Sequence, residues 1–281
     1  MELTLHTILI IITASSLAGI LAGMLGIGGG IIIVPMLYYL LTYFGYEQSI
    51  VMHIAVGTSL FIIIPTGFRS AIEHSKRNSF NKEIFNVWAP PIAIGAAIGS
   101  YLAGLSSFKG LTILFAILAM ILSIQMFINS RREMTPKKIN HPLLKISPFF
   151  IGLLSSMIGI GGGNLSVPIM NYMGIDVRRA IGTSSALGIV IAIPGSIGFM
   201  ISGYSLPGLP VYSLGYVNFL FAIFIVPMTF LFVPLGVKLA HIIPRNQLQR
   251  ILSLLLVITD CLLYTSPSTR DQRGSRMAGC A

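Results

Sequence analysis

The sequence predicts an all-α integral membrane protein of about ten membrane segments, arranged as two five-segment repeats in inverted orientation. Three observations predict this fold: 54% of the residues are apolar and only 9% are charged, apolar runs follow one another along the whole chain, and a glycine motif occurs twice. A bilayer core of about 30 Å takes about 20 apolar residues per helix, so a chain of 281 residues has room for about eight to ten helices. No room remains for a separate soluble domain.

Ten apolar segments are separated by Gly, Pro or charged residues. The second and the seventh are too short to cross a bilayer alone, because they would rise only about 21 Å and about 15 Å as helices. Each of the two follows a glycine cluster, and we expect both to be short or re-entrant. The predicted segments are 5–25, 31–44, 50–68, 84–105, 111–129, 146–158, 164–173, 180–203, 213–237 and 247–264.

We interpret residues 1–264 as one transmembrane permease domain, with repeat one at 5–129, a cytoplasmic loop at 130–145 and repeat two at 146–264. The first apolar run is expected to be retained as a helix, because no Lys or Arg precedes Arg69 and a signal peptide needs a positive start. Residues 265–281 form a polar, basic tail that resembles adapter or read-through sequence as much as a native end, and we assign it no function.

The repeat is visible in two motifs. The first is Gly-Ile-Gly-Gly-Gly, which begins at Gly26 and again at Gly159, an offset of 133 residues, and each copy is followed four residues later by Val-Pro. The second is Gly-Thr-Ser, at residues 57–59 and 182–184. Because each motif follows the same order in both halves, we expect the halves to be two copies of one helical unit.

Basic residues predict the orientation, because cytoplasmic loops collect Lys and Arg. If the segments cross alternately, fourteen of the 18 basic residues lie in loops on one face, at 69–83, 130–145, 174–179 and 238–250. The opposite loops hold Lys109 alone, and the other three lie in the tail. We therefore expect a multi-pass protein of the cell membrane whose two termini are both extracytoplasmic. Parity then places the two glycine clusters on opposite sides.

A duplicated GxGGG-x(3)-VP signature, with a GTS triplet after each copy in a ten-segment chain, resembles the sulfite exporter TauE/SafE family of membrane permeases. The resemblance covers essentially residues 5–264. It implies transport of small sulfur-containing anions such as sulfite, thiosulfate or sulfonates, and the family name implies export.

The glycine clusters are the predicted substrate site. Inverted-repeat transporters bind substrate near the midplane, where broken helices present their N-termini. A helix N-terminus leaves backbone N–H groups unpaired and carries a partial positive charge, so it binds an anion without a buried cation. Glycine removes the Cβ that would hold the anion away. The predicted nests consist of Gly26, Gly28, Gly29 and Gly30 in the first half, and of Gly159, Gly161, Gly162 and Gly163, with the amide of Asn164, in the second.

Hydroxyl groups are the next candidates, since they donate hydrogen bonds to sulfur oxyanions. The alternative is that each bonds a carbonyl of its own helix, as membrane Ser and Thr do routinely. The candidates are Thr58, Ser59, Thr183, Ser184 and Ser185. The pairs Gly19/Gly23 and Gly95/Gly99 have the small-xxx-small spacing, and there we favour close helix packing over binding.

His53 and His74 are the nearest ionisable candidates for a proton-linked step, and we retain His53 for it. An ordinary role near the membrane surface is the favoured alternative for both. Two cysteines, Cys261 and Cys280, offer no disulfide framework and no Cys-rich metal site, so no metal or other cofactor is expected.

Two rival functions remain open at the level of sequence. An anion channel or uniporter would share the fold and differ in conductance. A membrane-embedded enzyme is disfavoured, because the apolar runs hold no paired carboxylates, catalytic triad or metal-ligand cluster. The expected partners are a small anionic substrate and the lipid bilayer, without nucleic acid, and the subunit number is not visible.

Overall fold

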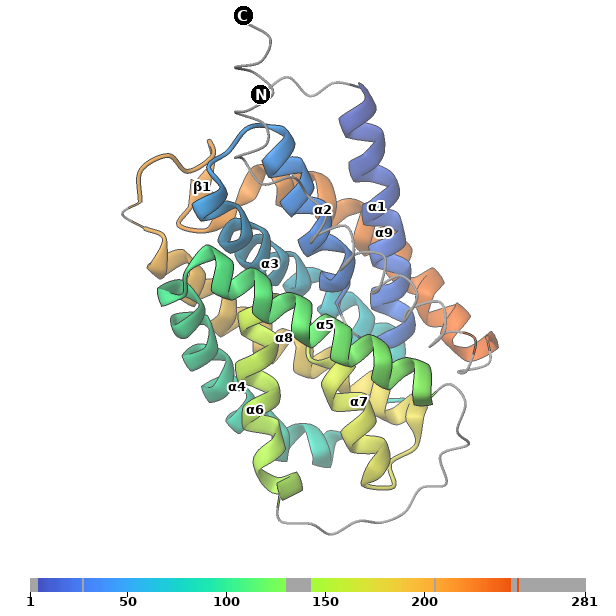
Figure 1. The fold of residues 1–281 in the computed structure, drawn as a ribbon. Coiled ribbons are helices and arrows are strands. Elements are labelled where there is room, and N and C mark those ends of the chain that lie inside the picture. Colours follow the sequence, from blue (N-terminus) through green and yellow to red (C-terminus); the bar gives the residue numbers. More distant parts are fainter. Residues whose placement is uncertain (1–4, 27, 130–142, 205, 244–246, 248–281) are drawn as a thin grey trace, which may run out of the picture.

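The computed structural model describes residues 5–26, 28–129, 143–204, 206–243 and 247. This part of the chain contains nine α-helices, and its only strands, of two residues each, pair as one hairpin (Figure 1). Apart from residue 247, the predicted tenth segment lies outside the described residues. The helices are α1 Leu5–Leu25, α2 Gly30–Tyr43, α3 Gln48–Ser75, α4 Lys82–Leu105, α5 Phe108–Asn129, α6 Leu143–Ile158, α7 Gly163–Tyr172, α8 Val177–Ser202 and α9 Phe219–Ile242, and the strands are β1 Ser213–Leu214 and β2 Val217–Asn218.

The helical membrane-protein class is confirmed. Six helices, α1, α3, α4, α5, α8 and α9, are long and apolar enough to cross a bilayer by length and composition. The helices α2 and α7 are short, with 14 and 10 residues, as the sequence predicts.

Polar residues make the starts of three helices differ from the predicted segments. The helices α4, α8 and α9 begin at side-chain caps: Asn81 accepts a hydrogen bond from the Ile84 N–H, Asp176 from the Arg178 N–H and Asn218 from the Phe221 N–H. These caps place the start of α4 and α8 before the apolar run. The predicted segment 213–237 is instead a hairpin, in which Ser213 pairs with Asn218, followed by α9.

The helices α3 and α8 form the centre of the bundle and run antiparallel. Gly57 near the start of α3 lies against Phe199 near the end of α8, while Gly182 near the start of α8 lies against His74 near the end of α3. We call the end of this pair beside the β1–β2 hairpin the hairpin end, and the end beside the connection 76–81 the loop end.

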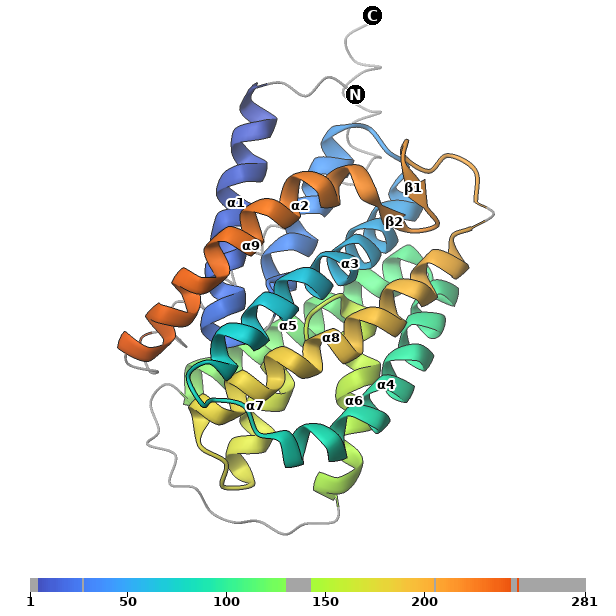
Figure 2. The same ribbon diagram turned by 180° about the vertical axis from the view of Figure 1, so that it is seen from behind.

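Two helix pairs flank this centre, α1 with α9 and α4 with α6, on opposite sides of the bundle (Figures 1 and 2). Glycine lets each pair approach closely: a Cβ at Gly19 would lie 2.6 Å from the carbonyl oxygen of Thr229, and Gly95 lies directly against the carbonyl of Phe149. The packing role that the sequence predicts for Gly19, Gly23, Gly95 and Gly99 is confirmed.

The short helices begin half-way along the central pair. Gly28, two residues before α2, lies against Ile63 in the middle of α3, and Gly162, just before α7, lies against Ile191 in the middle of α8. From there α2 runs toward the hairpin end, where the Phe44 ring stacks on Phe221 in the first turn of α9 at 6.5 Å. The described residues of each glycine cluster therefore lie in the interior of the bundle, where a short helix begins.

Candidate functional site

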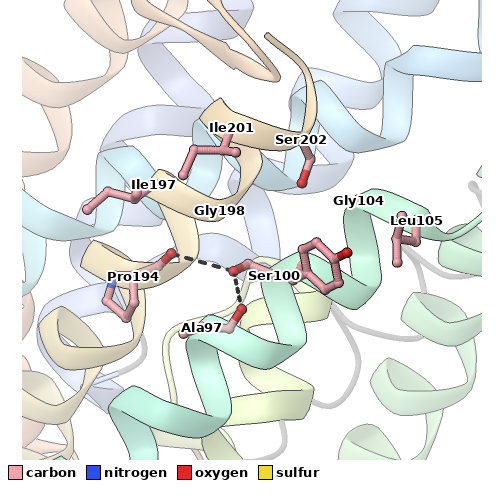
Figure 3. A pocket seen from close by; sticks show the side chains of 10 residues that line it. Ala97, Ser100, Gly104, Leu105, Pro194, Ile197, Gly198, Ile201 and Ser202 are labelled. Carbon is pink, nitrogen blue, oxygen red and sulfur yellow. Dashed lines mark hydrogen bonds between the residues drawn. The ribbon is translucent and has the colours of Figure 1, made fainter.

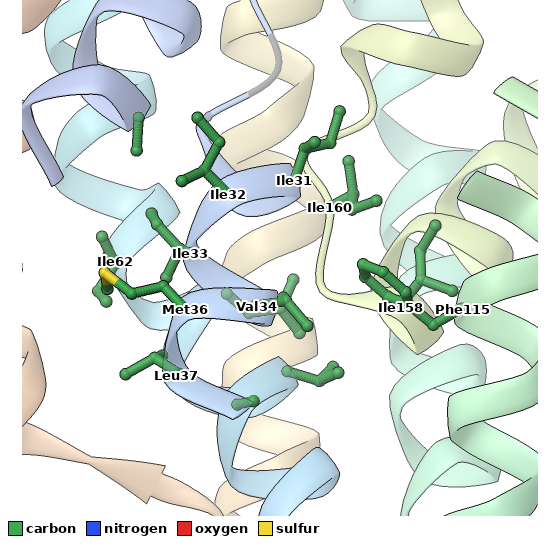
Figure 4. Packing of buried hydrophobic residues seen from close by; sticks show 14 of the residues in the cluster. Ile31, Ile32, Ile33, Val34, Met36, Leu37, Ile62, Phe115, Ile158 and Ile160 are labelled. Atoms are coloured by element: carbon green, nitrogen blue, oxygen red, sulfur yellow. The ribbon is translucent and has the colours of Figure 1, made fainter. Parts of the chain in front are cut away.

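The two glycine clusters meet inside the bundle. Gly30, the first residue of α2, lies directly against the carbonyl oxygen of Gly159, and the Ser59 hydroxyl donates a hydrogen bond to the same oxygen at 2.9 Å. Figure 4 shows the surrounding apolar side chains, with Ile31 of α2 next to Ile160 of the second cluster. Segments that are 133 residues apart in the sequence therefore form one internal site.

The backbone of the two clusters matches at the first glycine and at the last, where Gly30 and Gly163 each begin a helix, but not just before the helix start. Gly26 and Gly159 are both left-handed, with φ of 67° and 69°. Gly29 is also left-handed, with φ of 81°, whereas Gly162 at the corresponding position is right-handed, with φ of −57°. The two predicted nests are therefore not symmetric, and the difference lies just before the helix starts.

The second cluster carries two buried polar side chains without a partner. Asn164 is 4% exposed and Ser166 is fully buried, and in the described part of the chain neither the Asn164 amide nor the Ser166 hydroxyl has a hydrogen-bond partner. A buried unpaired polar group costs about 1–3 kcal/mol, so such groups are normally satisfied by an ordered water, an ion or a ligand where no protein group reaches them.

Ser166 was missed by the sequence reasoning, although a signal existed. The offset of 133 residues aligns Asn164 with Ile31 and Ser166 with Ile33. The first half is therefore apolar and the second half is polar at the same two places of the repeat, and the polar half holds the unpaired groups.

Both clusters also end in helix N-termini that face the interior. The Gly29 carbonyl accepts hydrogen bonds from the N–H groups of Ile32 and Ile33, and the Gly162 carbonyl accepts one from Ser166 at 2.8 Å. The N–H groups ahead of these positions have no carbonyl within their own helix. Together with the helix dipole they favour negative charge, so the arrangement is chemically suited to a small anion.

The hydroxyls of the first Gly-Thr-Ser triplet bind other segments of the chain. Thr58 Oγ1 accepts a hydrogen bond from the Asn218 N–H at 2.9 Å, while Ser59 donates to Gly159. These bonds join α3 to the hairpin and to the second glycine cluster.

The hydroxyls of the second triplet and its neighbour bond carbonyls of their own helix, which is the alternative that the sequence left open, and they also contact other segments of the chain. Thr183 donates to the Arg179 carbonyl at 2.7 Å, and Ser184 and Ser185 both donate to that of Ile181. Their role in substrate binding remains a prediction.

Both histidines of interest are buried within the protein, at 3% and 1% exposure, so neither side chain lies at the protein surface, while their position near the membrane surface stays a prediction. The His53 ring stacks on Tyr216 of the hairpin at 4.8 Å, and its Nε2 lies 3.1 Å from the Ser106 carbonyl. His74 Nε2 lies 2.8 Å from the carbonyl of Gly23. Burial also raises the pKa of the Tyr216 phenol, which therefore stays protonated at neutral pH.

A separate cavity of about 450 Å³ lies between α4 and α8 toward the hairpin end (Figure 3). Its floor is Ser100, whose hydroxyl donates to the carbonyls of Ala97 and Pro194, and its rim includes the exposed side chains of Leu105 and Ile201. None of the residues predicted to bind substrate lines it.

The family model described as "Sulfite exporter TauE/SafE" matches residues 11–262, which is most of the chain. This chain belongs to the sulfite exporter TauE/SafE family. Similar proteins are a "Probable membrane transporter protein" of Haemophilus influenzae, 34% identical over 89% of this chain and 96% of its own length, and one of Methanocaldococcus jannaschii, 30% identical over 88% and 91%. No solved structure matches at a significant level. The TauE/SafE match and these names indicate a multi-pass membrane transporter and not an enzyme.

Proposed function

We propose that this chain is a secondary transporter of the cell membrane that exports small sulfur-containing anions such as sulfite, thiosulfate or sulfonates. The substrate class and the direction follow from the description of the TauE/SafE family.

The observation that carries the proposal is the pair of unpaired polar groups at the start of α7. Asn164 and Ser166 offer N–H and O–H donors in an apolar interior, next to the free N–H groups of a helix N-terminus at mid-depth. An anion with several oxygen acceptors would satisfy these donors without a buried Lys or Arg. In this conformation Ile63 fills the Cβ position of Gly28 and Val56 that of Gly159, so approach of the anion's oxygens to the glycine backbone requires a conformational change of the transport cycle.

The proposed mechanism is alternating access around this site, by two inverted five-segment repeats. Matching contacts support the repeat: α1 packs on α9 as α6 packs on α4, and α3 packs on α9 as α8 packs on α4. We propose that α2 and α7 belong to re-entrant segments and begin near the middle of the membrane. We also propose that both termini are extracytoplasmic. His53 remains the candidate for proton coupling.

The test is a thermal-unfolding panel of the purified protein with sulfite, thiosulfate, sulfoacetate, taurine, sulfate and chloride at equal ionic strength. A specific ligand at 100 times its dissociation constant should stabilise the protein by about 2.7 kcal/mol. We expect the Asn164→Leu variant to unfold at the same temperature or higher, because an unpaired amide is replaced by an apolar group of similar size, and to lose the response to ligand.

The matched control is Asn171→Leu, which removes a buried amide at the other end of the same helix. It should keep the response to ligand. If no sulfur anion shifts the midpoint of the folded parent protein, the substrate class is wrong. If an anion shifts the parent and Asn164→Leu equally, the position of the site is wrong.

A further inference from the structure

At the hairpin end, the first Gly-Thr-Ser triplet holds the hairpin against α3. Gly57 has no side chain, so the carbonyl of Tyr216 comes within 2.8 Å of where a Cβ would be. Thr58 Oγ1 accepts a hydrogen bond from the Asn218 N–H, and the Tyr216 N–H donates to the carbonyl of Phe199 at 3.2 Å. We call this set of contacts the hairpin clamp.

The second triplet makes the same contacts at the loop end. Gly182 lies directly against the carbonyl of Ser79, Thr183 Oγ1 accepts a hydrogen bond from the Asn81 N–H at 3.0 Å, and the Ser79 N–H donates to the carbonyl of His74 at 3.1 Å. We call this set the loop clamp. Each clamp holds a connecting segment through one glycine and one threonine acceptor.

Each clamped segment ends at the residue that caps the next helix. Asn218 caps α9 with its side chain, and Asn81 caps α4 in the same way. The clamp uses the backbone N–H of this residue, and the cap uses its side chain. A segment that leaves its clamp therefore moves the start of the next helix with it.

The third residue of each triplet contacts the glycine cluster of the other half. Ser59 donates to the carbonyl of Gly159, and Ser184 lies 3.5 Å from that of Gly26. Neighbouring residues in one helical turn therefore touch the anion site on one side and a clamped segment on the other. This is a contiguous path by which occupancy of the site can change the stability of a clamp.

We propose that the two clamps are the gates of the transport path, and that they open in alternation. Release of the hairpin from Gly57 and Thr58 opens one end of the α3–α8 pair, and release of residues 76–81 from Gly182 and Thr183 opens the other. Both are closed in this structure, where Thr58 and Thr183 are fully buried. Neutral hydrogen bonds to a hydroxyl are weak enough to break and re-form in each cycle. The inference rests on the proposed transport function.

The test uses cysteine reporters beneath each gate in the full-length chain with Cys261→Ser and Cys280→Ser. Ala55 and Ala180 each precede the glycine of a triplet by two residues and are fully buried. A membrane-impermeant maleimide is applied to vesicles of either orientation that carry Ala55→Cys or Ala180→Cys. We expect the cysteine at 55 to react only from the hairpin side and the one at 180 only from the loop side.

A variant of one clamp should change the rate of maleimide labelling at the reporter cysteine of that clamp only. Thr58→Val, which keeps the shape and removes the acceptor, should raise labelling at 55 by about five- to tenfold and leave 180 unchanged, as the loss of one neutral hydrogen bond allows. Thr183→Val should do the reverse, and Thr58→Ser should restore the parent rate. Thr229→Val is the control, because this buried hydroxyl bonds only carbonyls of its own helix α9.

Equal labelling from both sides, or no selective change in either clamp variant, would overturn the gate proposal. If Thr58→Val does not reach the membrane, the side from which each reporter cysteine reacts in the chain with intact clamps still tests the gate proposal. Labelling needs no substrate, so selective gating without any response to sulfur anions would remove the proposed substrate class alone. A sulfur-anion response with reporters that show no sidedness would remove the gates alone.

Discussion

At the scale of single residues, two glycines in corresponding places of the repeat differ in backbone conformation and in what they contact. Gly29 is left-handed, and a Cβ there would lie 2.9 Å from the Ala18 carbonyl oxygen. Gly162 is right-handed, and a Cβ there would meet the end of the Ile191 side chain at 2.5 Å and Ser166 Oγ at 3.4 Å. The first glycine is required by the backbone conformation and by close contact with backbone, and the second by the end of one side chain packed beside the proposed site.

We therefore expect Gly29→Val to lose more than about 3 kcal/mol of stability, through backbone strain and a clash with backbone. Gly162→Ala should stay within about 1 kcal/mol of the parent, because Ile191 can rotate, while a methyl group next to Ser166 should reduce anion flux. Thermal unfolding in detergent measures the first effect and flux into proteoliposomes the second. A parent-like midpoint for Gly29→Val would contradict the strain, and full flux in Gly162→Ala would show that the substrate does not pass next to Gly162.

The sequence located the glycine clusters and Asn164 because repetition and residue type are visible in the letters. It could not locate the unpaired state of Ser166, nor the partners of Thr58 and Ser59, because these depend on which distant backbone groups come near. The carbonyl of Gly159 is 100 residues from Ser59, and no local pattern encodes that contact.

At the scale of elements, hydropathy predicted the helices well and their ends poorly. The run from 50 to 68 stops at Arg69, yet α3 continues to Ser75, because Arg69 pairs with Glu73 at 3.4 Å one turn later and lies over the Phe230 ring. The hairpin was missed because Ser213–Asn218 is too short to show a strand pattern.

The glycine contacts between helices predict a contrast in stability. At Gly99 a Cβ would collide with the backbone carbonyl of Leu153 and with Ser156 Oγ, so Gly99→Ala should push α4 away from α6 and destabilise by about 1–3 kcal/mol. Gly188 on α8 has no neighbour closer than 4.0 Å, so Gly188→Ala should be neutral or stabilising by up to about 1 kcal/mol. Thermal unfolding of the two variants checks this, and equal midpoints would contradict close packing of α4 on α6.

At the scale of the whole molecule, the contacts that occur in matching pairs join the two predicted halves to each other. The first helix of each half packs on the fourth helix of the other half, α1 on α9 and α6 on α4, while the central α3 and α8 pack together. The halves are therefore interleaved, and neither buries its helices alone. A motion that opens one end of the bundle must slide the helices of these pairs past each other. Glycine keeps the paired helices close together, with mostly backbone atoms in contact.

The orientation of this interleaved bundle should depend on its basic loops. Replacing Lys137 and Lys138 by Ser, and placing two Lys at the exposed Leu206 and Val211 of the opposite connection, should give mixed orientation or lower membrane levels, because positive charge opposes translocation. A cysteine at Ser213, in the chain with Cys261→Ser and Cys280→Ser, reports the side reached by an impermeant maleimide. Two further Lys in 174–179, a loop expected to be cytoplasmic, are the control and should leave the labelling at 213 extracytoplasmic. Unchanged labelling after the charge transfer would contradict the predicted topology, and the gates would then keep their positions in the fold but exchange sides of the membrane.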